Sequence, residues 1–340
     1  MPDQMPADHP ALKPPKIGVL LLNLGTPDAT DFASVRRYLK EFLSDGRVIE
    51  TNRVLWWLIL NGIILNVRPQ KSGHAYDKIW DREANDSPLR VISRRQAEKL
   101  QQRFAGTDVI VDFAMRYGNP STEAKLKELQ AAGCQKILLL PLYPQYSAPT
   151  AATANDKAFD VLKTMRWQPA VRTAPAYFDD PVYIEALARS IDEGVKALDF
   201  EPDLVITSYH GMPVSYLMAG DPYHCQCMKT TRLVRELLGW PKEKLMVTFQ
   251  SRFGRAEWLK PYTADTLEEL PKRGIKKIAI LAPAFSVDCI ETLEEIAITG
   301  REQFMHGGGE AYAYIPCLND SEGGMAMLEH VVRRELGGWI

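Results

Sequence analysis

Short apolar runs alternate along the chain with longer segments in which apolar residues recur every three or four positions. The run at residues 204–206 shows no polar alternation, which is typical of a strand buried on both faces, and Gly211 and Pro213 end it. Residues 30–44 instead place their apolar side chains on one stripe of a helix. Repeated alternation of such strands and helices predicts an α/β fold with parallel sheets.

The same two patterns predict the other elements. We expect buried strands at residues 16–25, 109–115, 136–140, 171–174 and 277–282. We expect helices at residues 121–132 and 181–197, and a helix that begins near Asp288 and Glu291, after the strand at 277–282.

The two halves of the chain resemble each other, which indicates an internal duplication. Residues 25–27 match residues 211–213, which places Leu24 opposite His210. Residues 116–118 match residues 252–254, so Arg116 and Arg252 are expected at equivalent loop positions. Six further residues match at identical spacing, from Leu126, Leu129, Gly133, Lys136, Ile137 and Leu140 to Leu267, Leu270, Gly274, Lys277, Ile278 and Leu281.

The duplication predicts two similar Rossmann-like α/β domains, each a parallel sheet flanked by helices, which face each other across a cleft. We place the N-terminal domain at 16–180 and the C-terminal domain at 181–325. Residues 1–15 are expected to form a disordered leader, and residues 326–340 a terminal helix.

The most apolar segment lies at residues 53–67 and includes the pair Trp56 and Trp57. It is shorter than a bilayer span. One interpretation is a buried helix; the other is an apolar lip, at about 50–72, that touches a membrane or admits an apolar ligand. Basic residues at positions 53, 68 and 71 favour placement at a membrane interface.

Composition excludes several classes of protein. The net charge of −2 over 340 residues gives no reason to expect nucleic acid as a partner. Five dispersed cysteines do not make a disulfide framework, and the N-terminus lacks the pattern of a signal peptide. We therefore expect a cytoplasmic protein. Because of the apolar segment, peripheral contact with the inner face of the membrane is a further expectation that stays open.

His210 and two carboxylates are the first candidates for chemistry. His210 stands at the carboxyl end of a strand, the edge at which open α/β sheets bind ligands. Its imidazole suits proton removal near neutral pH. Asp288 and Glu291 are three residues apart and are expected to share a helical face at the same edge of the sheet. The alternatives are a structural histidine and acids that complement a helix dipole.

Aromatic and basic residues in the first half suit a flat, apolar ligand that carries carboxylates. Arg116 and Arg252 are candidates for pairing with a ligand carboxylate, and Tyr117, Tyr143 and Tyr146 lie nearby in the predicted loops. Ordinary packing is the alternative for each tyrosine. The segment 224–227, His-Cys-Gln-Cys, lacks the ligand spacing of a zinc or iron–sulfur site.

Several ordered motifs resemble the ferrochelatase family of bacterial type. They lie at 22–27 (LNLGTP), 116–121 (RYGNPS), 141–147 (PLYPQYS), 208–213 (SYHGMP), 220–223 (GDPY), 250–254 (QSRFG) and 285–295 (FSVDCIETLEE). The resemblance implies two chelatase-type domains and insertion of Fe²⁺ into protoporphyrin IX, giving heme b and two protons. Iron is then a substrate, and a porphyrin-donating enzyme is a further candidate partner.

The resemblance also implies roles for individual residues. It makes His210, Glu291 and Asp288 catalytic, with His210 and Glu291 also as metal contacts and with Glu291 facing His210 across the cleft. As porphyrin-binding residues it implies Arg116, Tyr117, Tyr143, Leu24 and Trp258. The apolar segment near Trp56 and Trp57 corresponds to the family's lip, for which we expect transient membrane contact.

Three positions depart from other family members. Cys289 stands where many members have histidine, and Leu24 stands where some have tyrosine. Ala148 stands where animal members have a cysteine that binds a [2Fe–2S] cluster, so we expect no such cluster here. A chelatase for coproporphyrin III, a non-catalytic heme or porphyrin carrier, and a nucleotide-dependent transferase remain as alternatives; the transferase is weakened because no phosphate-binding motif is present.

Overall fold

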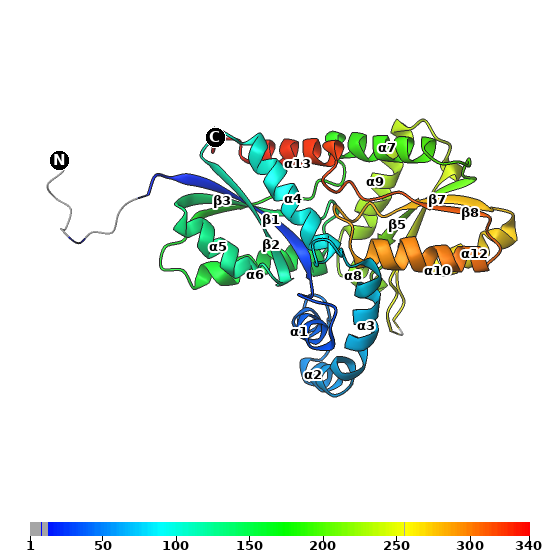
Figure 1. Cartoon of the computed structure of the whole chain (residues 1–340), viewed down its shortest axis with the longest axis horizontal. Helices are drawn as coiled ribbons and strands as arrows, with labels where there is room; N and C mark the ends of the chain where they lie inside the picture. Colours follow the sequence, from blue (N-terminus) through cyan, green and yellow to red (C-terminus); the bar gives the residue numbers. More distant parts are fainter. Residues whose placement is uncertain (1–7, 9–12, 255) are drawn as a thin grey trace.

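The computed structural model describes residues 8, 13–254 and 256–340, and the predicted leader 1–15 falls mostly outside them (Figure 1). The described residues form two parallel sheets of four strands each, with strand orders β2-β1-β3-β4 and β6-β5-β7-β8. The strands of the first sheet are β1 (Lys16–Thr26), β2 (Val109–Gly118), β3 (Cys134–Pro141) and β4 (Ala170–Thr173). Those of the second are β5 (Leu204–His210), β6 (Leu245–Gln250), β7 (Lys277–Leu281) and β8 (Ala311–Tyr314).

The identical strand orders confirm the two-domain α/β prediction, and part of the predicted duplication holds to the residue. Gly18 pairs with Ile137 and Leu204 pairs with Ile278. Gly18 lies as far before Leu24 as Leu204 lies before His210. The central strand and the strand next to it therefore repeat in register, as the matched apolar positions predicted.

The predicted match between Arg116 and Arg252 is wrong by two residues. His210 pairs with Gln250, whereas Leu24 lies between the residues that pair with Met115 and Tyr117, so Leu24 is opposite Arg116. The counterpart of Arg116 is thus Gln250. Arg116 lies within β2, and Arg252 lies in the loop that follows β6. The similar tripeptides at 116–118 and 252–254 therefore lie at different positions relative to the carboxyl ends of β2 and β6.

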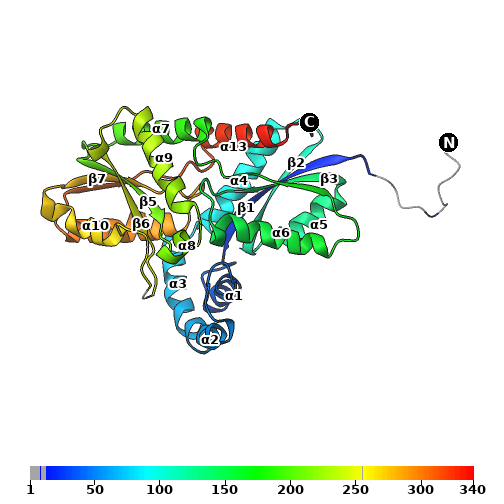
Figure 2. The same cartoon turned by 180° about the vertical axis from the view of Figure 1, so that it is seen from behind.

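Helices cover both faces of each sheet, as Figures 1 and 2 show. In the N-terminal domain, α4 (Pro88–Arg103) packs on one face of the sheet, and α5 (Thr122–Ala131) and α6 (Thr153–Lys163) pack on the other. In the C-terminal domain, α7 (Pro181–Lys196) and α9 (Tyr223–Leu237) pack on one face. The other face holds α10 (Thr263–Glu269), the π-helix η5 (Leu293–Gly300) and α12 (Arg301–His306). The shorter elements are α8 (Val214–Met218), α11 (Ile290–Thr292), η2 (Ala148–Ala152), η3 (Lys242–Lys244) and η4 (Pro271–Arg273).

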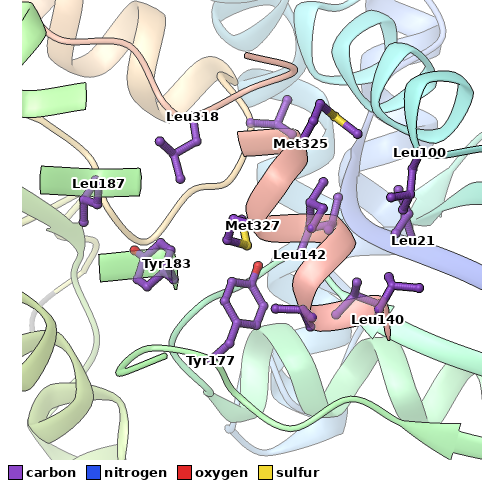
Figure 3. Packing of buried hydrophobic residues seen from close by; sticks show 14 of the residues in the cluster. Leu21, Leu100, Leu140, Leu142, Tyr177, Tyr183, Leu187, Leu318, Met325 and Met327 are labelled. Atoms are coloured by element: carbon purple, nitrogen blue, oxygen red, sulfur yellow. The ribbon is translucent and has the colours of Figure 1, made fainter. Parts of the chain in front are cut away.

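One apolar core joins the two domains. It contains Leu21 and Leu140 from the first sheet together with Val205 and Leu281 from the second. The last helix, α13, runs Glu322–Glu335, beginning and ending earlier than predicted, and packs against both α4 and α7. Figure 3 shows Met327 of this helix near Leu142, Tyr177 and Tyr183, and Met325 on the side toward Leu100. The two domains are therefore held together by buried apolar surface rather than by a linker alone.

A helical lip projects from the N-terminal domain (Figures 1 and 2). It follows α1 (Phe32–Leu43) and consists of α2 (Arg53–Ile59), the π-turn η1 (Leu60–Ile64) and α3 (Leu65–Ile79). Trp56 is buried, but Trp57 is 62% exposed and Val54 72% exposed, and further exposed apolar residues are Leu55, Leu58, Ile63 and Val67. The buried-helix interpretation is therefore wrong for most of this segment. None of the helices in the described residues is long and apolar enough to span a bilayer.

Candidate functional site

A cavity of about 440 Å³ lies between the lip and the two domains. The N-terminal domain contributes an apolar wall that includes Leu24, Phe42, Leu142 and Tyr143. The C-terminal domain contributes polar and titratable residues, namely His210, Ser251, Arg252, Cys289, Glu291 and Glu295, together with Trp258 and Phe285. An apolar cavity of this size with a few converging polar groups is the usual form of a small-molecule site.

His210 is the last residue of β5 and lines the cavity. Its Nδ1 lies 2.7 Å from the carbonyl oxygen of Gly211. Because a carbonyl oxygen only accepts hydrogen bonds, Nδ1 must carry the proton in this contact. In the neutral ring Nε2 then holds the free lone pair, so His210 has the tautomer of a base.

Glu291 follows β7 and lies in the first turn of α11, on the cavity wall. β7 is the neighbour of β5 and runs parallel to it, which confirms that Glu291 and His210 reach the same edge of one sheet. Both residues therefore come from the C-terminal domain rather than from opposite domains. The amide of Gln250 donates to the carbonyl oxygen of Glu291 at 2.7 Å, and so fixes the backbone at this residue.

Glu295 is a functional candidate that the sequence analysis did not single out. It lies in η5, on the cavity wall, and accepts a hydrogen bond from the Ser251 hydroxyl. Burial and the neighbouring charge of Glu291 raise the pKa of Glu295 to about 7. A carboxyl group with that pKa exchanges protons at neutral pH. Its position four residues after Glu291 was the signal available in the sequence.

Asp288 is not among the described residues that line the cavity. The prediction that it shares a helical face with Glu291 is wrong, because α11 begins at Ile290 with Cys289 as its N-cap. The buried Asp288 carboxylate instead accepts hydrogen bonds from Thr292 at 2.8 Å, from Tyr314 at 2.5 Å and from the Asn319 amide at 2.6 Å. These contacts indicate a structural anchor for the segment that carries Glu291.

Arg116 and Tyr117 lie behind the cavity wall rather than on it. Neither is among the described residues that line the cavity, and Tyr117 is fully buried. Arg116 pairs with Asp45 and donates to Thr153, and the Tyr117 hydroxyl donates to Asp45 at 2.9 Å. Arg252 does line the cavity, with its guanidinium over the ring of Tyr262. Among the described residues, the cations that line the cavity are thus Arg252 and, from the lip, Arg68, rather than Arg116.

Tyr143, Leu24 and Trp258 lie on the wall as the sequence analysis expected. The Tyr143 side chain is 8% exposed, and burial raises the pKa of its hydroxyl well above the ordinary value. Within the described residues, neither this hydroxyl nor the buried Trp258 indole N–H has a hydrogen-bond partner. Two buried donors without partners on a cavity wall are suited to a ligand that brings acceptors.

The segment 224–227 has a packing role in this structure. Cys227 is buried, and the Gln226 side chain accepts from the backbone N–H of Tyr146 at 2.7 Å. Among the described residues, no three histidine, cysteine, aspartate or glutamate side chains gather closely enough to enclose a metal ion.

Comparison with known proteins decides the family. The family model described as Ferrochelatase matches residues 16–336. The chain belongs to the ferrochelatase family. It is 60% identical over 339 residues to a protein named ferrochelatase from Allorhizobium ampelinum, covering 99% of this chain and 98% of the relative. It is 60% identical over 334 residues to one from Rhizobium meliloti, with 98% of each chain covered.

Solved structures extend the likeness to the fold. The chain resembles SirB from Bacillus subtilis with Fe³⁺ at a TM-score of 0.56 and 12% identity, over 94% of this chain and 95% of that one. It resembles the sirohydrochlorin chelatase SirB from Bacillus subtilis subspecies spizizenii, in complex with cobalt, at a TM-score of 0.57 and 9% identity, over 95% of this chain and 96% of that one. At such low identity these likenesses concern the fold, and they agree with two chelatase-type domains.

Proposed function

We propose that this member of the ferrochelatase family inserts Fe²⁺ into protoporphyrin IX, forming heme b and releasing two protons. The observation that carries the proposal is the cavity itself. It joins an apolar wall, suited to a flat macrocycle, to a histidine in the tautomer of a base and two carboxylates. Iron is a substrate in this reaction.

The apolar wall serves to bind and distort the macrocycle. A planar tetrapyrrole keeps its nitrogen lone pairs in the ring plane and holds two N–H protons, so a metal ion does not enter it directly. Contact with Leu24, Leu142 and Tyr143 on one side buries the apolar ring. Burial at roughly 25 cal/mol per Å² offsets a distortion of a few kcal/mol.

The polar side of the cavity handles protons and metal. In the proposed mechanism His210 Nε2 accepts a pyrrole proton, and the carboxylate of Glu291 stabilises the resulting imidazolium. Glu295 then passes protons outward, because its pKa of about 7 lets it both accept and release them. We assign the transient metal contact to Glu291 and to His210 Nε2. Because Nε2 has one free lone pair, it holds the ion before insertion and accepts a pyrrole proton only after the ion has passed to the porphyrin.

The lip is proposed to contact a membrane transiently, so that the protein works in the cytoplasm at the inner face of the membrane. Its exposed apolar residues adjoin Arg53 and Arg68, and Arg68 lines the cavity. An apolar porphyrin, alone or on a donating enzyme, would then meet the entrance at the membrane surface. We also expect no [2Fe–2S] cluster, which the iron content of the purified, porphyrin-free protein tests.

The choice of porphyrin tests the proposed activity. Purified protein is given Fe²⁺ anaerobically with protoporphyrin IX or coproporphyrin III, and insertion is followed by absorbance. We expect the higher kcat/KM for protoporphyrin IX, because extra carboxylates are costly to desolvate against the apolar wall. Preference for coproporphyrin III would reassign the substrate. Porphyrin binding without insertion by the wild type would instead indicate a carrier and contradict the proposal.

A further inference from the structure

A carboxylate with a largely buried side chain, that of Asp45, lies where the lip joins the N-terminal domain. It follows α1, and its side chain is 10% exposed. Its Oδ2 accepts hydrogen bonds from the guanidinium of Arg116, from the hydroxyl of Tyr117 and from the hydroxyl of Thr153. Its Oδ1 accepts from the backbone N–H of Arg47 at 2.8 Å. Four donors thus converge on one carboxylate.

The hydrogen bonds hold this carboxylate ionised. Burial raises the pKa of Asp45, but the bonds from Thr153, Arg47 and Tyr117 and the charge of Arg116 outweigh that effect and leave the pKa below its ordinary value. Arg116 is 13% exposed and also donates from Nε to the carbonyl oxygen of Thr153 at 2.9 Å. The cluster is therefore a paired and well-bonded unit.

Two of the partners of Asp45, Thr153 and Tyr117, adjoin different parts of the cavity wall. Thr153 begins α6 directly after η2, which supplies the wall residues Pro149 and Thr150. The ring of Tyr117 meets the ring of Phe42, also on the wall, edge to face at 5.1 Å. Three segments that are distant in sequence therefore meet at one oxygen atom.

The backbone of Asp45 continues the same arrangement into the lip. Its carbonyl oxygen accepts from the N–H groups of Val48 at 3.3 Å and Ile49 at 3.1 Å, and both residues line the cavity. Just before Asp45, the carbonyl oxygen of Leu43 accepts from the Trp56 indole at 2.6 Å. The lip is thus attached at the residues that flank Asp45.

We propose that Asp45 is a positioning residue for the macrocycle: by bonding to β2, to the start of α6 and to the root of the lip, it sets the width of the porphyrin cavity. The inference rests on the proposed function, because it takes a porphyrin as the ligand. Asp45 is not among the described residues that line the cavity, so it acts through Phe42, Val48, Ile49 and Thr150.

Asp45→Asn tests the proposal, because it keeps the shape of the side chain and removes its charge. We expect the KM for protoporphyrin IX to rise about tenfold while the KM for the metal ion stays near the wild-type value. Protoporphyrin IX affinity, measured by quenching of tryptophan fluorescence without metal, should weaken by a similar factor. Thr153→Val, which removes one donor from the cluster, should shift both quantities in the same direction by less.

The control is Asp112→Asn, which breaks the partly buried pair of Asp112 with Lys125 in the same domain. It should leave porphyrin KM and affinity unchanged. Wild-type porphyrin KM and affinity in Asp45→Asn, or an equal loss in Asp112→Asn, would overturn the proposal; if Asp45→Asn fails to fold, Thr153→Val decides in the same way. The quenching measurement needs no turnover, so it tests this inference even if wild-type protein inserts no metal and the proposed activity fails.

Discussion

At the scale of single residues, the chain separates the groups that face the ligand from those that hold them in place. His210, Glu291 and Glu295 line the cavity. The Asp288 carboxylate instead accepts hydrogen bonds from Tyr314 and Asn319. Sequence spacing alone did not distinguish these two cases. Asp288 and Glu291 are close in sequence, but the N-cap at Cys289 turns one away from the cavity and leaves the other on its wall.

Glu295 gives a prediction about stability and pH. Its pKa of about 7 in the folded protein lies above the ordinary value of 4.5, so the folded state binds the proton more tightly. The stabilisation linked to this proton is fully present below about pH 4.5 and is lost as the pH rises through about 7. Glu295→Gln resembles the protonated form. Its free energy of unfolding relative to that of wild type should therefore increase by on the order of 2 kcal/mol when the pH is raised from 5 to 8.5.

Urea unfolding of both proteins at the two pH values measures this gain. Glu302→Gln, at an exposed position on α12, serves as the control and should show no such change. A difference between Glu295→Gln and wild type that stays constant from pH 5 to pH 8.5 would mean that Glu295 titrates as an ordinary surface carboxylate.

At the scale of elements, the lip combines a buried anchor with an exposed apolar surface. The Trp56 indole donates to the carbonyl oxygen of Leu43, whereas Trp57, Leu58 and Ile63 face outward. The sequence predicted the length and apolar character of this segment. It did not settle the burial of the segment, because burial depends on whether other elements cover it, and the helical period is the same in both cases.

The exposed lip residues give a prediction about membrane binding. A variant with Trp57→Ser and Leu58→Ser should cosediment with vesicles containing anionic lipid several-fold less than wild type, because it removes apolar surface from the interface. Its turnover with detergent-solubilised porphyrin should stay near wild type. The matched control is Phe159→Ser, at an exposed apolar position on α6 outside the lip. Equal vesicle binding by wild type and the lip variant would contradict the proposed membrane contact.

At the scale of the whole molecule, the duplication explains both what the sequence predicted and what it did not. The apolar spacing fixed the register of β1 with β3 and of β5 with β7, because buried strands specify which face points inward. The match of Arg116 with Arg252 failed because it relied on a short polar motif near the strand ends. Long-range contacts, such as that of Asp45 with Arg116, leave no periodic signal in the sequence.

The shared core also explains how the site is held. Because α13 packs on helices of both domains, the wall with Leu24 and the wall with His210 belong to one packed unit. The lip packs in a separate cluster that includes Trp56 and Leu60. The cavity therefore lies between two domains that share one core, and the lip borders it.

The most direct test of the central claim is anaerobic metal insertion by wild type, His210→Ala and Glu291→Gln, with Fe²⁺ and protoporphyrin IX followed by absorbance. We predict turnover by the wild type and a loss of at least about 100-fold in kcat for each variant, with porphyrin affinity largely retained, since general-base catalysis typically contributes this much. Phe159→Ser provides the folded control. Wild-type kcat in His210→Ala would contradict the assignment of His210 as the base.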